Sequence, residues 1–167
     1  MKKIALTQGK FAIVDDSDFG FLNQWKWYAL PDKTRTYYAA RTILRPVKIT
    51  VRMHRVILGL KPGDVRKADH KNGNGLDNRR GNLRVCDDYE NQHNRWKQAK
   101  MATSKYKGVC VVSYRGYRYF NTRIQVNNKR IFLGSFPYTP EGELSAARVY
   151  NSAAKKHHGA FAQLNIL

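Results

Sequence analysis

Residues 69–94 read D-H-K-N-G-N-G-L-D-N-R-R-G-N-L-R-V-C-D-D-Y-E-N-Q-H-N, and they carry the strongest local pattern of the chain. Residues 66–70 and 82–86 are typical of two short strands. Between them, residues 72–81 contain three glycines and three asparagines, which suit an irregular loop with backbone positions at positive φ. Either of two adjacent aspartates, Asp87 or Asp88, can cap a helix that runs to about Lys100. The stretch predicts a strand, a long loop, a strand and a helix.

The polar side chains of this stretch suit a metal ion and a base. Asp69 ends the first strand and Asn91 falls in the first helical turn, and their oxygens are hard ligands that suit Mg²⁺ with several waters retained. His70 points to the opposite side of its strand from Asp69. A neutral imidazole there could deprotonate a water without entering the metal's coordination sphere. Asn82, twelve residues after His70, is expected to tie down the loop and orient the histidine.

Each of these residues also has a structural interpretation. A single Asp-His pair is common, and a lone histidine is more often structural than catalytic. The asparagines Asn72, Asn74, Asn78 and Asn82 suit turn formation. The joint spacing of the acid, the histidine and the two asparagines favours the chemical interpretation.

Charge is the strongest global signal. The 167 residues carry a net charge of +19. Residues 1–100 hold 21 Lys and Arg against 10 Asp and Glu, and residues 101–167 hold 10 against 2, so both halves are basic. Basic residues that neutralise phosphates release counterions, which favours nucleic acid as the partner. High solubility is one alternative; a membrane surface is disfavoured, because no basic amphipathic helix with an aromatic face is evident.

Composition predicts a folded protein inside the cell. A length of 167 residues suits one ordinary domain or two small ones. No stretch approaches the roughly 20 apolar residues of a membrane span, and the first residues lack the apolar run of a signal peptide. We therefore expect a cytoplasmic protein. Cys86 and Cys110 are expected to be small, buried and reduced rather than bridged.

The remaining segments predict two further groups of elements. In residues 1–65, strands are expected at 10–14, 25–30, 37–44 and 47–53, with short helices after the acidic turn 15–18 and at 54–58. Beyond a polar linker at 101–105, three strands are expected at 108–114, 117–126 and 130–136. They are joined by tight turns at 115–116 and 127–128. A helix from Pro140 to about His158, closed by Gly159, should cover one face of that sheet.

The motif resembles a known nuclease family. D-H-x-N-G-N-x-x-D-N-R-x-x-N-L-R followed by E-N-x-x-N is similar to the HNH motif of the phage-type, free-standing homing endonucleases of the ββα-metal group, over roughly residues 10–98. The resemblance implies that His70 is the general base, that Asn82 is the central asparagine, and that Asp69 and Asn91 bind one Mg²⁺ or Mn²⁺. His93 and Asn94 are candidates for contacts to the residues that hold the metal, and His93 is an alternative ligand. His54, in the similar upstream segment V-R-M-H-R-V-I-L-G, is expected to be structural or to contact phosphate.

The C-terminal part resembles another family. The stretches S-K-Y-K-G-V, R-I-Q-V-N-N-K-R-I-F-L-G-S-F and A-A-R-V-Y-N-S-A-A-K-K-H-H-G-A-F-A-Q-L-N are similar to AP2-type DNA-binding domains, whose three-stranded sheet lies in the major groove. Ile131 and Leu133 would pack under the helix. Cys110 and Val112 stand where the family commonly places arginines, so the target sequence is not transferable. The residues expected to contact DNA are Asn121, Arg123, Gln125, Lys129, Arg130 and Phe132, together with Arg79 and Arg80 of the first motif.

These resemblances imply an α+β protein with an HNH nuclease domain at 1–100, whose ββα-metal motif spans about 66–100, and an AP2-like domain at 106–167. The implied activity is metal-dependent, site-selective hydrolysis of double-stranded DNA to 5′-phosphate and 3′-hydroxyl ends. A monomer should nick one strand, and a dimer assembled on DNA is the other possibility. The implied source is a phage or mobile element, with no protein partner evident. Two alternatives stay open: a non-catalytic AP2-type regulator and a low-specificity phage HNH nuclease.

Overall fold

The computed structural model describes residues 1–32, 36–44, 46–94 and 104–167. The chain forms two compact units, Met1–Asn91 (unit 1) and Gln92–Leu167 (unit 2). Both combine helices with small antiparallel sheets, which confirms the α+β class. The division falls at residues 91 and 92, nine residues before the boundary that the sequence predicted. Residues 95–103, which include most of the predicted linker, lie outside the described residues.

Unit 1 begins with a strand that the sequence did not predict. β1 (Lys2–Ala5) pairs antiparallel with β2 (Phe11–Val14). The acidic turn after β2 leads into α1 (Asp16–Leu22). Asp16 and Asp18 lie in the first turn of this helix, where negative charge is favourable.

A three-stranded sheet and a short helix complete the core of unit 1. The sheet order is β3 (Tyr28–Pro31), β4 (Tyr37–Ile43), β5 (Ile49–Arg52), and α2 (Met53–Ile57) follows directly. The strand predicted at 25–30 starts later, because the Trp27 indole turns back to donate to the Leu22 carbonyl at 2.8 Å. The buried core consists of Ile4, Leu6, Ala12, Val14, Leu22, Trp27, Ala29, Ala39, Met53, Ile57 and Leu83.

The predicted strand-loop-strand-helix segment forms β6 (Lys67–His70), β7 (Leu83–Cys86) and α3 (Asp88–His93). The strands pair antiparallel, with His70 opposite Leu83. The loop between them is attached to β2: the Ile13 N–H donates to the Leu76 carbonyl, and the Asn78 N–H donates to the Ile13 carbonyl, both at 2.8 Å. Leu83 belongs to the core of unit 1, so the hairpin is anchored at both its loop and its second strand.

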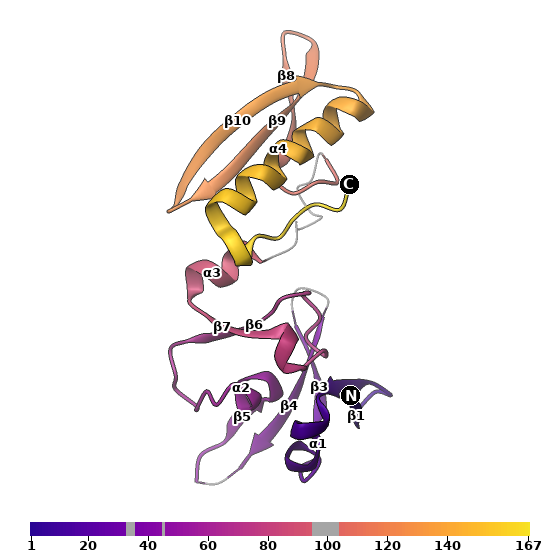
Figure 1. Ribbon diagram of the computed structural model, residues 1–167, viewed down its shortest axis with the longest axis vertical. Helices are drawn as coiled ribbons and strands as arrows, with labels where there is room; N and C mark the ends of the chain where they lie inside the picture. Colours follow the sequence, from indigo (N-terminus) through magenta and orange to yellow (C-terminus); the bar gives the residue numbers. More distant parts are fainter. Residues whose placement is uncertain (33–35, 45, 95–103) are drawn as a thin grey trace. The chain divides into compact units, whose positions relative to one another are not determined.

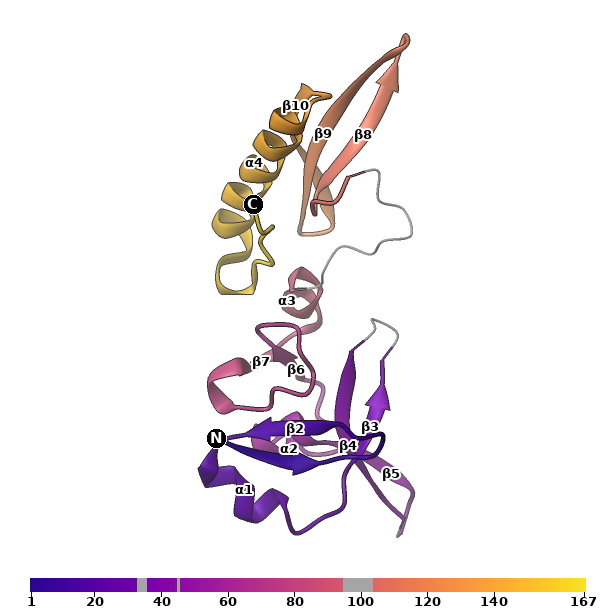
Figure 2. The same cartoon turned by 90° about the vertical axis from the view of Figure 1, so that its right-hand side faces the viewer.

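Unit 2 is a sheet covered on one face by a long helix (Figures 1 and 2). β8 (Val109–Tyr114), β9 (Tyr117–Val126) and β10 (Lys129–Pro137) form an antiparallel sheet in the order β10-β9-β8. Asn127 and Asn128 both have positive φ, as the tight hairpin turn requires. α4 (Pro140–His158) begins at its N-cap Thr139, whose side chain accepts a hydrogen bond from the Gly142 N–H at 3.1 Å.

α4 lies close to the sheet because its inner face is built from small residues. Ala146, Ala147 and Ala154 are fully buried. The Thr122 hydroxyl of β9 donates to the Ala146 carbonyl at 3.3 Å. At Gly108 a Cβ atom would lie 2.0 Å from the Tyr150 ring, so only glycine fits there. Among the residues described, no helix has the length and apolar character needed to cross a membrane.

Candidate active site

His70 lies at the centre of the site, at the end of β6, and is only 4% exposed. Its Nε2 is 3.2 Å from Oδ1 of Asn78. The rings of Tyr38 and His54 lie 5.8 and 4.8 Å from the His70 ring. Burial lowers the pKa of His70 below its usual 6.5, and the Asn78 hydrogen bond and nearby carboxylates offset this only in part. The imidazole is therefore neutral at neutral pH, the state that a general base requires.

His54 is a structural neighbour of this histidine. It is 3% exposed, and its Nδ1 is buried with no hydrogen-bond partner among the described residues. Burial, then the proximity of His70 and two arginines, lowers the pKa of His54 to about 2. A residue so firmly neutral suits the structural role expected of it better than a phosphate contact.

Asp69 is buried in an ion pair. Its register partner across the hairpin is Arg84, whose Nη2 and Nε lie 2.6 and 2.8 Å from Oδ2 of Asp69. The Asp69 and Arg84 side chains are 9% and 12% exposed. Sequence reasoning did not assign Arg84 a role, although the pairing of the predicted strands would have placed it opposite Asp69. The guanidinium holds the carboxylate in place at the end of β6.

Asn91 lies on α3, the helix that directly follows the hairpin. Asp87 caps this helix: its side chain accepts from the Glu90 N–H at 2.7 Å, and Glu90 accepts from the Asp87 N–H at 3.0 Å. The Asn91 N–H donates to the Asp87 carbonyl at 3.1 Å. Asn91 is thus one turn beyond the cap.

The other two candidates lie at the end of α3, with His93 its last residue and Asn94 in the turn beyond it. Asn94 is 8% exposed. The side chain of His93 lies outside the described residues.

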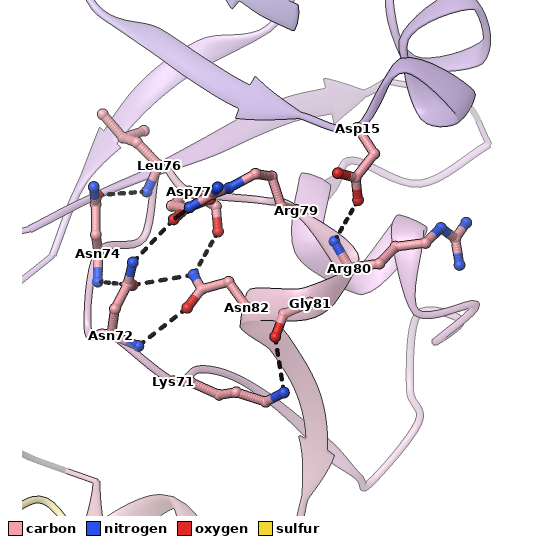
Figure 3. A network of polar contacts seen from close by, with 10 residues as sticks. All are labelled: Asp15, Lys71, Asn72, Asn74, Leu76, Asp77, Arg79, Arg80, Gly81 and Asn82. Carbon is pink, nitrogen blue, oxygen red and sulfur yellow. Dashed lines mark hydrogen bonds and ion pairs between the residues drawn. The ribbon is translucent and has the colours of Figure 1, made fainter. Parts of the chain in front are cut away.

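Asn82 makes the loop-spanning hydrogen bonds that the sequence predicted for it (Figure 3). Its Oδ1 accepts from the Asn72 N–H at 3.1 Å. Its Nδ2 donates to the Asn72 side chain at 3.0 Å and to the Asp77 carbonyl at 2.7 Å. One amide therefore joins both ends of the loop, which fixes the path of the chain from His70 to β7.

Arg79 and Arg80 form ion pairs within unit 1. Arg79 binds the carboxylate of Asp77 through two contacts of 2.7 Å. Arg80 binds Asp18 through contacts of 2.8 and 2.7 Å. Both guanidinium groups thus have carboxylate partners that sequence reasoning did not assign. Asp18 is distant from Arg80 in the chain, whereas Asp77 is only two residues from Arg79. Their side chains remain 43% and 57% exposed, and a role in DNA binding stays a prediction.

The donor set limits how a metal ion could be held. No group of three or more His, Cys, Asp or Glu side chains that could hold an ion occurs in the described part of the chain. A divalent cation would therefore depend on Asp69, an amide oxygen such as that of Asn91, and water. Mg²⁺ fits such a site, because it commonly binds through one or two carboxylates and keeps several waters.

The sheet face of unit 2 opposite α4 carries most of the predicted DNA contacts. Phe132 is 57% exposed, and the exposed residues Arg123, Gln125 and Arg130 share its face. Lys129 is exposed too, but it pairs with Val126 and so lies on the α4 side of the sheet, unlike the prediction. Asn121 differs from the prediction, because it is only 8% exposed and accepts a 2.6 Å hydrogen bond from Ser135. This amide is occupied within the sheet rather than presented outward.

A β-bulge changes the pattern of β10. The register shifts between Phe132 and Gly134. Leu133 packs against the Ile124–Tyr150–Ala154 cluster, as predicted. Ile131, which was also expected under the helix, pairs with the buried Ile124 and so lies on the α4 side of the sheet, but it is 38% exposed and lies outside the Ile124–Tyr150–Ala154 cluster.

The exposed aromatic residues at the β8–β9 turn were not predicted as functional. Tyr114 and Tyr117 flank the turn and are 60% and 78% exposed. The Arg115 guanidinium lies 5.3 Å from the Tyr114 ring. Their alternation with basic residues is visible in the sequence and could have indicated a surface for bases and phosphates.

Both cysteines are free, as predicted. Cys86 is buried, and burial raises the pKa of its thiol to about 11, so it is inert near neutral pH. Cys110 is only partly buried.

Comparison of the chain with protein-family models, curated proteins and solved structures finds no match.

Proposed function

We propose that this chain is a metal-dependent DNA endonuclease. The observation that carries the proposal is the neutral, buried imidazole of His70, next in sequence to the Asp69 carboxylate that Arg84 holds in place. Both lie on a hairpin whose loop is fixed by Asn82 and whose second strand leads into a helix. This arrangement supports the resemblance to the ββα-metal nucleases.

In the proposed reaction, His70 takes a proton from water as the oxygen attacks the scissile phosphorus. The bond to the 3′ oxygen breaks and that oxygen takes a proton from solvent water, which leaves 5′-phosphate and 3′-hydroxyl ends. Asp69 and Asn91 would hold the divalent cation, which supplies stabilisation for charge at the phosphate and the leaving oxygen. Arg84 holds the Asp69 carboxylate in its orientation.

Unit 2 is proposed to bind double-stranded DNA through the sheet face opposite α4. This unit carries 13 Lys and Arg against 2 Asp and Glu. Arg123, Gln125 and Arg130 are exposed on that face, where they could reach phosphates or base edges. An AP2-like mode of binding, and site-selective nicking in a phage or mobile element, are part of this proposal.

The test is a nicking assay on supercoiled plasmid and on a long mixed-sequence duplex, with magnesium or with chelator. We expect wild type to nick only with metal, His70→Ala to lose activity, and His157→Ala, an exposed histidine on α4, to act as wild type. No metal-dependent nicking by wild type on either substrate would contradict the endonuclease.

The charge of unit 2 favours one second candidate, a non-catalytic DNA-binding regulator. It predicts duplex binding without any nicking. If wild type does cut, the positions of the cleaved ends on the long duplex measure its sequence selectivity. Clustered ends support a site-selective enzyme, whereas scattered ends indicate a low-specificity nuclease.

A further inference from the structure

Asn78 is a buried residue of the loop that no part of the proposed reaction uses. Its side chain is fully buried, at 0% exposed. Its backbone N–H donates to the Ile13 carbonyl of β2 at 2.8 Å. The loop is fixed on either side, since Asp77 binds Arg79 and Asn82 binds the Asp77 carbonyl. Asn78 therefore has a fixed backbone and a side chain that cannot reorient into solvent.

Among the described residues, the Asn78 side chain makes one hydrogen bond, to His70. Oδ1 lies 3.2 Å from Nε2 of His70, while Nδ2 is buried without a partner among the described residues. A neutral imidazole has one N–H and one bare nitrogen, and a carbonyl oxygen can only accept. An oxygen facing Nε2 therefore requires that Nε2 carries the hydrogen.

We propose that Asn78 is a positioning residue that fixes the Nε2–H tautomer of His70 and leaves Nδ1 as the nitrogen that accepts the proton from water. The tautomer follows from the orientation of the Asn78 amide, with Oδ1 toward His70, whereas the catalytic consequence rests on the proposed function. The rings of Tyr38 and His54 assist by restricting the plane of the imidazole. Asn78 thus does for the histidine what an orienting carboxylate or carbonyl does in other sites.

The opposite orientation of the Asn78 amide makes the opposite prediction. With Nδ2 facing His70, the amide would donate to a bare Nε2, and the ring hydrogen would be on Nδ1. Nε2 could not then serve as the base, because it would accept the hydrogen bond from Asn78. Nδ1 could not serve either, because it would carry the ring hydrogen. The two orientations are therefore distinguished by which ring nitrogen carries the hydrogen.

Long-range ¹H–¹⁵N correlation spectra of the labelled full chain measure this directly at mildly alkaline pH. The chain has five histidines, so the signals that vanish in His70→Ala identify the ring. We expect a protonated, pyrrole-type Nε2 and a bare, pyridine-type Nδ1. The reverse pattern, or an even mixture, would overturn the proposal, whether or not the protein cuts DNA.

Variants then test the consequence for cleavage. Asn78→Leu keeps the size and removes the acceptor, and Asn78→Asp keeps an acceptor at the same place. Asn74→Ala is the matched control, an exposed asparagine of the same loop. Single-turnover nicking at saturating DNA should fall about 10- to 100-fold in Asn78→Leu, the range typical of groups that orient a histidine. Asn78→Asp should recover most of the rate.

DNA affinity separates positioning from a general structural defect. We expect the Kd for duplex DNA of Asn78→Asp and Asn74→Ala to stay near wild type. Full-rate nicking by Asn78→Leu would refute the positioning role. Absence of nicking in wild type would instead refute the endonuclease, and the spectra would still decide the tautomer.

Discussion

At the scale of single residues, the Asp69–Arg84 pair is the most sensitive part of unit 1. Both side chains are almost fully buried, and a buried charge that loses its partner is costly. We expect Arg84→Leu to lower the free energy of unfolding by about 3–5 kcal/mol, measured by urea denaturation. Arg66→Leu is the control, because its pair with Asp64 lies at the surface with Arg66 60% exposed. That variant should change stability by about 0–1 kcal/mol, and equal effects of the two would contradict the prediction.

The two buried histidines make stability depend on pH. The pKa values of His54, at about 2, and of His70 lie below the ordinary 6.5 in the folded protein. The unfolded chain therefore binds protons that the folded chain excludes, and stability falls as pH drops below about 6.5. The slope should reach about 1.4 kcal/mol per pH unit for each histidine.

Urea unfolding between about pH 7 and pH 5 checks this, since carboxylates titrate mostly at lower pH. His54→Leu should reduce the slope by about half if both histidines contribute fully. A flat stability profile across this range would show that the rings are protonated in the folded state.

At the scale of elements, the approach of α4 to the sheet depends on Gly108. This residue has φ +78°, and an added Cβ would lie 2.0 Å from the Tyr150 ring. We expect Gly108→Ala to destabilise unit 2 by about 2–4 kcal/mol, from overpacking and backbone strain. Gly116 has a similar φ of +83°, but nothing lies within 4 Å of a Cβ added there. Gly116→Ala should therefore cost only backbone strain, about 1–2 kcal/mol. Thermal unfolding measures the difference, which should vanish if the helix is loosely packed.

Local signals explain which elements the sequence could predict. β9 and α4 have the predicted bounds, because tight turns, Pro140 and Gly159 mark their ends within a few residues. β1 was missed, since its pairing with β2 is not encoded in a local pattern.

For the candidate site, the order of polar residues in the sequence indicated His70 and Asn82 as parts of one site. The partners Arg84, Asn78 and Tyr38 were not identified, because their proximity is a result of strand pairing and loop packing.

At the scale of the whole molecule, the charge of +19 predicts DNA binding that weakens steeply with salt. If the open sheet face of unit 2 carries the contact, Arg123→Ala should weaken duplex binding by about 1–3 kcal/mol. Arg148→Ala, an equal loss of charge at an exposed position on α4, should have little effect at the same salt concentration. Binding titrations over a salt series compare the two, and a larger loss in Arg148→Ala would place DNA elsewhere.

The attachment of the loop to β2 has a consequence for protein engineering. A fragment excised at residues 60–94 would retain Asp69, His70, Asn82 and Asn91, but not Ile13, whose two hydrogen bonds hold the backbone around Asn78. It would also lack the aromatic neighbours of His70. The motif is therefore not autonomous, and a graft into another scaffold must bring a strand equivalent to β2 with it.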